Sequence, residues 1–103
     1  MMYMHIVLLA FKETPDAAWL EGMEACCQRI RQECEGWEIY HFGPNRAALS
    51  QGYSHAVISA FQDAQALENY KIHPAHIALE AFAGPALARV LVLDDDVPSF
   101  GRG

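Results

Sequence analysis

The stretch from Tyr70 to His76 contains the side chains best suited to moving a proton. His76 follows Pro74 by two positions, and proline is favoured in the first turn of a helix, so we expect His76 in such a turn. The positive end of that helix disfavours a second positive charge, so the imidazole is expected to be neutral at about pH 7. A neutral imidazole can take a proton from an activated carbon or hydroxyl.

Tyr70 lies six residues before His76 and offers a hydrogen bond to a carbonyl oxygen that becomes an enolate. Together the two side chains suit enolisation, cyclisation or isomerisation without a cofactor. The alternative is structural, with both side chains bonding only backbone groups at the junction of two helices. The sequence leaves both interpretations open.

The other histidines form no evident metal site. His5 and His55 are expected on neighbouring strands with the same side-chain orientation, yet as much as about 15 Å apart by the strand rise. We therefore expect them at the polar ends of an apolar cavity, and not around a shared ion. His41 and His73 are interpreted as edge or cap residues, and the run from Asp94 to Asp96 as a solvated strand end.

Three cysteines, Cys26, Cys27 and Cys34, fall within one predicted helix. They show no CxxC spacing for zinc, and adjacent cysteines form no usual structural disulfide. We interpret them as reduced thiols of a cytoplasmic protein.

The charge balance argues against several classes of partner. The 103 residues carry a formal net charge of −6 without a cluster of lysine or arginine, which disfavours DNA, RNA and anionic membranes.

No apolar run approaches the roughly 18–20 residues of a membrane span, and the apolar start lacks the features of a signal peptide. No nucleotide, flavin or phosphate fingerprint is found, so no cofactor is expected.

Apolar spacing and capping residues predict four strands and three helical segments. The strands are expected at residues 2–12, 37–42, 53–61 and 89–94. One helix is expected between Thr14 as its N-cap and Gly36 as its C-cap, and a second at 64–72 after Asp63. A third starts at Pro74 and carries Leu87 beyond a kink at Gly84-Pro85. Residues 1–96 are expected to form one domain, and 97–103 a flexible tail.

This order of elements predicts an α+β fold, a ferredoxin-like βαββαβ sandwich with a four-stranded antiparallel sheet. Both helical regions would cover one face of the sheet, and nothing else in the chain would cover the other. That face would measure roughly 450 Å², as large as the largest apolar patch of a typical monomer. We expect two copies to pair through it as a dimeric α/β barrel. The alternative is a monomer whose outer face is made partly polar by Glu38 and Ser54.

Several motifs resemble those of the stress-responsive dimeric α/β-barrel (Dabb) family. The most specific is Leu67-x-x-Tyr70-x-x-His73-Pro74-Ala75-His76. The others are His5-Ile6-Val7-Leu8-Leu9, Gly52-Tyr53-Ser54-His55 and Val90-Leu91-Val92-Leu93-Asp94. The resemblance covers nearly the whole chain and implies a ferredoxin-like homodimer joined sheet to sheet.

The resemblance also implies a pocket within each subunit, between the sheet and the helices. A plant branch of the family, which includes olivetolic acid cyclase, cyclises polyketides with the tyrosine and the last histidine of this motif as its catalytic pair. These match Tyr70 and His76, and two further pocket histidines of that branch match His5 and His55. The other expected lining residues are Val7, Leu9, Met23, Cys27, Val57, Phe82, Leu87, Val90 and Val92.

Three functions follow from these observations. The first is a homodimer that binds or converts a small carbonyl or aromatic compound, with His76 as base and Tyr70 as hydrogen-bond donor. The second is a non-enzymatic, stress-associated dimer that binds a ligand or a protein partner. The third and weaker one is a cofactor-independent monooxygenase, since other dimeric α/β barrels carry out that chemistry.

Overall fold

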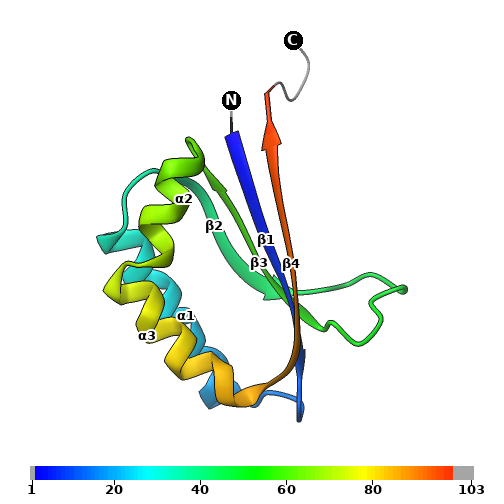
Figure 1. Cartoon of the computed structure of the whole chain (residues 1–103). Helices are drawn as coiled ribbons and strands as arrows, with labels where there is room; N and C mark the ends of the chain where they lie inside the picture. Colours follow the sequence, from blue (N-terminus) through cyan, green and yellow to red (C-terminus); the bar gives the residue numbers. More distant parts are fainter. Residues whose placement is uncertain (1, 99–103) are drawn as a thin grey trace.

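A computed structural model describes residues 2–98 and shows helices on only one face of a four-stranded sheet (Figure 1). The strands are β1 (Met2–Phe11), β2 (Trp37–Pro44), β3 (His55–Phe61) and β4 (Leu87–Val97). The helices are α1 (Ala17–Glu33), α2 (Ala64–Lys71) and α3 (Pro74–Ala83), and the short 3-10 turn η1 (Gly84–Ala86) follows α3.

The strands lie in the order β2-β3-β1-β4, and all neighbouring pairs are antiparallel. Strand β1 is central and apolar on both faces, as its sequence predicts. Its register places His5 opposite Ser59 of β3 and opposite Asp94 of β4. The expected ferredoxin-like α+β fold is confirmed.

Short polar side chains start the helices. The carboxylate of Asp16 accepts the backbone N–H of Trp19 at 2.8 Å, so Asp16 is the N-cap of α1 and the expectation for Thr14 is wrong. Asp63 caps α2 as expected, accepting from Ala66 at 2.8 Å. Before α3 the cap is His73, whose Nδ1 accepts the N–H of Ala75 at 3.0 Å. Each cap satisfies an N–H group that the helix itself leaves free.

Strand β2 ends and β3 begins two residues later than expected, and both ends of the last strand shift as well. Helix α3 ends at Ala83, because Gly84 and Pro85 form η1, so Leu87 opens β4 and does not belong to a helix. Strand β4 then runs through Val97, past the expected start of the tail. The rest of that predicted tail, residues 99–103, lies outside the described residues.

The core lies between the helices and one face of the sheet. Helix α1 contributes Met23, Cys27 and Ile30, and Phe61 of β3 and Leu67 of α2 complete its centre; all five side chains are buried. Burial of such side chains is the main source of stability in a domain of this size.

The opposite face of the sheet has no helix over it (Figure 1). Large apolar side chains on this face are exposed by between 38% and 54%: Ile39, Ile58, Leu91 and Leu93. We call this surface the open face. Among the described residues, no helix is both long and apolar enough to cross a membrane.

Candidate functional site

A cavity of about 540 Å³ lies between the helix-facing side of the sheet and helices α2 and α3. Strands β1, β3 and β4 supply an apolar wall, and the ends of α2 and α3 supply most of the polar groups. The lining residues are His5, Val7, Leu9, Met23, Tyr40, Val57, Tyr70, Lys71, His76, Leu79, Glu80, Ala83, Gly84, Leu87, Val90, Val92 and Asp94.

The junction of α2 and α3 brings Tyr70 and His76 together. Tyr70 is in the last turn of α2, and its carbonyl accepts the N–H of His73 at 3.1 Å, which closes the turn. Pro74 then starts α3 and places His76 in the first turn. The ring centroids of Tyr70 and His76 are 4.3 Å apart. The expected helix start at Pro74 is confirmed, and it sets this contact.

The two ring nitrogens of His76 differ in their partners. Nδ1 lies 3.1 Å from the carbonyl oxygen of Lys71, the last residue of α2. A carbonyl can only accept, so Nδ1 carries the proton and the neutral ring keeps a lone pair on Nε2. Within residues 2–98, Nε2 has no hydrogen-bond partner. No side-chain nitrogen there is both buried and without a partner, so Nε2 keeps accessible surface, and the His76 residue lines the cavity. A purely structural role, in which the ring bonds only backbone groups, therefore accounts for Nδ1 of His76 but not for Nε2.

The hydroxyl of Tyr70 lies 2.7 Å from that of Tyr40, and both side chains are buried. Burial raises the pKa of both tyrosines, so both are neutral at physiological pH. Among the described residues the hydroxyl of Tyr40 has only this hydrogen-bond partner. When Tyr40 donates to Tyr70, the proton of Tyr70 is left for a ligand, and a chain of two hydroxyls strengthens that bond.

A second imidazole reaches the same cavity from the sheet. Nδ1 of His5 lies 2.5 Å from Oδ1 of Asp94, its register partner on β4. The rings of His5 and Tyr70 form an edge-to-face pair, with the centroids 6.1 Å apart and the ring planes at 67°. The expectation that the Asp94 side chain is merely solvated is therefore wrong, because this carboxylate is bound to a buried histidine.

Few charges surround this cavity, and most are negative. Asp94 and Glu80 both line it, and Oε1 of the largely exposed Glu80 lies 3.4 Å from Nδ1 of His76. The ammonium of Lys71 pairs with Glu68 at 3.3 Å.

Ten of the thirteen residues expected in the site line this cavity: His5, Val7, Leu9, Met23, Val57, Tyr70, His76, Leu87, Val90 and Val92. The other three do not. Cys27 is fully buried in the core, His55 stacks on Phe42 with the centroids 5.5 Å apart, and Phe82 stacks on Trp19 at 5.3 Å.

The residues that sequence reasoning missed include Tyr40, Lys71, Glu80 and Asp94. Tyr40 and Asp94 come from β2 and β4, far in sequence from the Tyr70–His76 motif. Glu80 could have been found, because it lies four residues after His76 and so shares its helix face.

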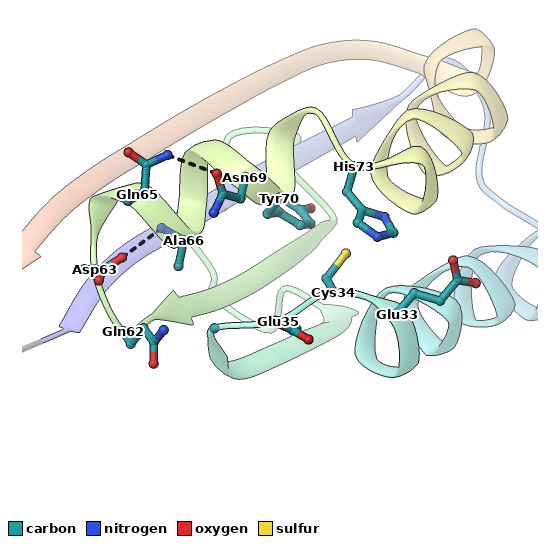
Figure 2. Close-up of a pocket in the computed structure, with 11 residues that line it drawn as sticks. Glu33, Cys34, Glu35, Gln62, Asp63, Gln65, Ala66, Asn69, Tyr70 and His73 are labelled. Carbon is teal, nitrogen blue, oxygen red and sulfur yellow. Dashed lines mark hydrogen bonds between the residues drawn. The ribbon is translucent and has the colours of Figure 1, made fainter.

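Tyr70 also lines a second hollow of about 470 Å³, shown in Figure 2. This hollow lies between the end of α1 and α2, and its lining mixes polar side chains, such as Gln62, Gln65 and Asn69, with Cys34, Ala66 and Tyr70. None of the other expected site residues lines it. Over residues 2–98, no group of three or more His, Cys, Asp or Glu side chains is placed to hold a metal ion.

Comparisons with known proteins agree with this architecture. Residues 4–97 match the family described as Stress responsive A/B Barrel Domain, or Dabb. The stress-response A/B barrel domain-containing protein HS1 of Arabidopsis thaliana is 28% identical over 92 residues, covering 87% of this chain and 84% of that protein.

Two solved structures illustrate the range of proteins with this fold. A dimeric ferredoxin-like protein of unknown function from Thermobifida fusca is 22% identical, with a TM-score of 0.80 over 94% of this chain and 92% of that one. A hydroxynitrile lyase from Passiflora edulis is 17% identical, with a TM-score of 0.81 over 97% of each chain. With the match over residues 4–97, the chain belongs to the stress-responsive A/B barrel domain (Dabb) family.

Proposed function

We propose that this protein is an acid–base catalyst that acts on small, uncharged and mainly apolar carbonyl compounds without a cofactor. His76 takes a proton from the carbon beside the carbonyl group, and Tyr70 binds the carbonyl oxygen as it becomes an enolate. Enolisation is the first step of both isomerisation and aldol cyclisation, so the pair is compatible with either overall reaction.

The observation that carries the proposal is the free Nε2 of His76 beside the Tyr70 ring. The carbonyl of Lys71 holds the Nδ1 proton, which fixes the tautomer in which Nε2 is the basic atom. The centroid distance of 4.3 Å allows one carbonyl compound to contact both side chains. The hydroxynitrile lyase from Passiflora edulis indicates that this fold can carry an enzyme active site.

The cavity supports the choice of substrate class. Its β-strand wall is made of apolar side chains, among them Val7, Val57 and Val92. The carboxylates of Asp94 and Glu80 repel an anionic ligand, while the only lining lysine is already paired. An apolar body with one uncharged carbonyl group therefore suits the cavity better than a carboxylic acid or a phosphate ester.

Deuterium exchange tests this function. We expect the wild-type protein in D₂O to speed the loss of the α-proton NMR signals of phenylacetone or 2-heptanone. His76→Ala should lower the rate by about 10²-fold or more, because that is the usual contribution of a general base. Tyr70→Phe should lower it as well, whereas Ile77→Ala, an exposed position on the same helix, should not.

Two outcomes would contradict different parts of this proposal. Exchange at the wild-type rate in His76→Ala, with an unchanged melting temperature, would exclude His76 as the base. A wild-type protein that is stabilised by these ketones but exchanges no protons would favour the non-enzymatic, ligand-binding function, because binding raises the melting temperature without chemistry.

The open face supports a second part of the proposal, a homodimer. Four large apolar side chains are exposed on it, and a protein of the same fold from Thermobifida fusca is described as dimeric. We expect sedimentation at micromolar concentration to give twice the 11.5 kDa chain mass. Leu93→Asp should produce monomers. Leu49→Asp is the matched control, because Leu49 is 85% exposed in the β2–β3 loop. A monomeric wild-type protein would exclude the dimer.

A further inference from the structure

We propose that His5, held by Asp94, is a second proton-transfer group in the cavity, so that the site moves a proton from one atom of its substrate to another. This inference rests on the proposed function, in which His76 removes the first proton. His5 would be a catalytic residue, because its free nitrogen contacts the substrate. Asp94 would be a positioning residue, because it acts through His5.

The hydrogen bond between the two side chains assigns the nitrogens of His5. A carboxylate can only accept, so the 2.5 Å contact between Oδ1 of Asp94 and Nδ1 of His5 places a proton on Nδ1. The other nitrogen, Nε2, has no partner among the described residues. No side-chain nitrogen there is both buried and without a partner, so Nε2 keeps accessible surface, and the His5 residue lines the cavity.

The pair is rigidly built. His5 and Asp94 are direct register partners on β1 and β4, so two paired strands and not a loop fix their positions. Ser59, on the other side of β1, donates its hydroxyl to the backbone carbonyl of His5 at 2.6 Å. The His5 residue is only 7% exposed. A substrate would therefore meet an imidazole whose orientation is already set.

The two imidazoles have different electrostatic surroundings. His5 faces a carboxylate that is one-third exposed, so it remains hydrated and can balance the charge of an imidazolium ring. His76 has a neutral carbonyl on Nδ1 and lies at the positive end of α3, with only the exposed Glu80 nearby. The arrangement favours His76 as the proton acceptor and His5 as the proton donor.

A β,γ-unsaturated ketone shows how the two groups would cooperate. The α C–H bond breaks, its proton goes to Nε2 of His76, and its electron pair forms a dienolate whose oxygen is bound by Tyr70. In this proposal His5 enters the step as an imidazolium ring, with one proton on Nδ1 held by Asp94 and one on Nε2. The γ carbon takes the Nε2 proton, and the electrons return to restore the C=O bond in conjugation with the new C=C bond. His76 ends with one extra proton and His5 lacks one. Solvent resets both through the cavity, which the half-exposed Val90 and Val92 show to be open.

The test separates the first proton transfer from the second. With 3-cyclohexen-1-one in D₂O, NMR follows both α-deuterium exchange, which needs His76 and Tyr70, and conversion to the conjugated ketone, which also needs His5. We expect Asp94→Asn to keep the exchange rate within about threefold while conversion falls tenfold or more. The asparagine oxygen can still accept the Nδ1 proton, so a merely structural link between β1 and β4 would survive, but the negative charge is lost.

Two further variants complete the design. His5→Gln should likewise retain exchange and lose conversion. Asp96→Asn is the matched control, because Asp96 lies on the same face of β4, opposite Tyr3, and it should leave both rates unchanged.

The failures are distinguishable. Equal loss of exchange and conversion in Asp94→Asn, or no loss of either, would overturn the role of the His5–Asp94 pair while leaving the proposed function intact. If the wild-type protein catalyses neither process with this ketone, both the pair and the proposed function are contradicted.

Discussion

The hydroxyl oxygens of Tyr40 and Tyr70 lie 2.7 Å apart, although the two residues are 30 positions apart in the chain and come from β2 and α2. This contact ties α2, which carries Tyr70, to the edge strand β2. When Tyr40 is the donor in this bond, the proton of Tyr70 can point to a ligand.

Removing the Tyr40 hydroxyl should therefore affect both stability and activity. We expect Tyr40→Phe to lower the free energy of unfolding by about 1 kcal/mol, the usual worth of such a hydrogen bond. Ketone exchange should slow, because Tyr70 loses the partner that orients its hydroxyl. Tyr53→Phe in the β2–β3 loop serves as the control. An unchanged exchange rate in Tyr40→Phe would show that Tyr70 needs no help from Tyr40.

The stability should depend on pH through His55. Burial lowers the pKa of His55. Its ring contacts the rings of Phe11 and Phe42. The unfolded chain therefore binds a proton at His55 more readily than the folded protein does. The stabilisation that depends on neutral His55 is fully present above the unfolded pKa of about 6.5, and it is lost as the pH falls through the folded pKa. Thermal melts below about pH 6.5 should show a smaller loss of stability in His55→Gln than in the wild type. Parallel pH profiles would contradict this account.

The cysteines should differ in reactivity. Burial, reinforced by Glu24, raises the pKa of Cys27 to about 12, and the side chain has no exposed surface. Cys26 is only half-buried. We expect a thiol reagent at about pH 8 to modify Cys26 first and Cys27 only on unfolding, since the thiolate is the reactive form. Mass spectrometry of the digested protein identifies the site, and early labelling of Cys27 would contradict the packing of α1.

Gly36 should tolerate no side chain. Its φ is +80°, and an added Cβ would lie 2.7 Å from Cβ of Ala66. Gly36→Ala should therefore cost more than about 1 kcal/mol, which in a domain of this size lowers the melting temperature by at least roughly 4–8 °C. Gly84→Ala is the matched control. The backbone of Gly84 is helical, and a Cβ added there would meet no atom within 4 Å. A Gly36→Ala variant as stable as the wild type would contradict the positive φ and the close Ala66 contact at this position.

Much of the fold could be predicted because its signals are local. Asp63 precedes α2 and Pro74 opens α3, and both signals lie within a few residues of the structure they set. The same locality explains why Tyr70 and His76 could be placed together. Leu87 was harder, because it continues the apolar helical spacing of α3 although Gly84 and Pro85 have already ended that helix.

The rest of the site depends on contacts between distant segments. Strand register brings Asp94 to His5, and no feature near residue 94 announces that pairing. Phe82 shows the reverse problem, since helical spacing cannot tell which neighbour a side chain meets. Its ring packs over Gly22 of α1, where the missing Cβ leaves room for it, and so it turns away from the cavity.

The most direct test of the central claim is the protonation pattern of the His76 ring. Long-range ¹H–¹⁵N NMR, recorded while the His76 ring is neutral, distinguishes a protonated ring nitrogen from one with a free lone pair. The account predicts a proton on Nδ1, held by the carbonyl of Lys71, and a bare Nε2 facing the cavity. A neutral ring with its proton on Nε2 would leave the cavity without the base on which the proposed chemistry depends.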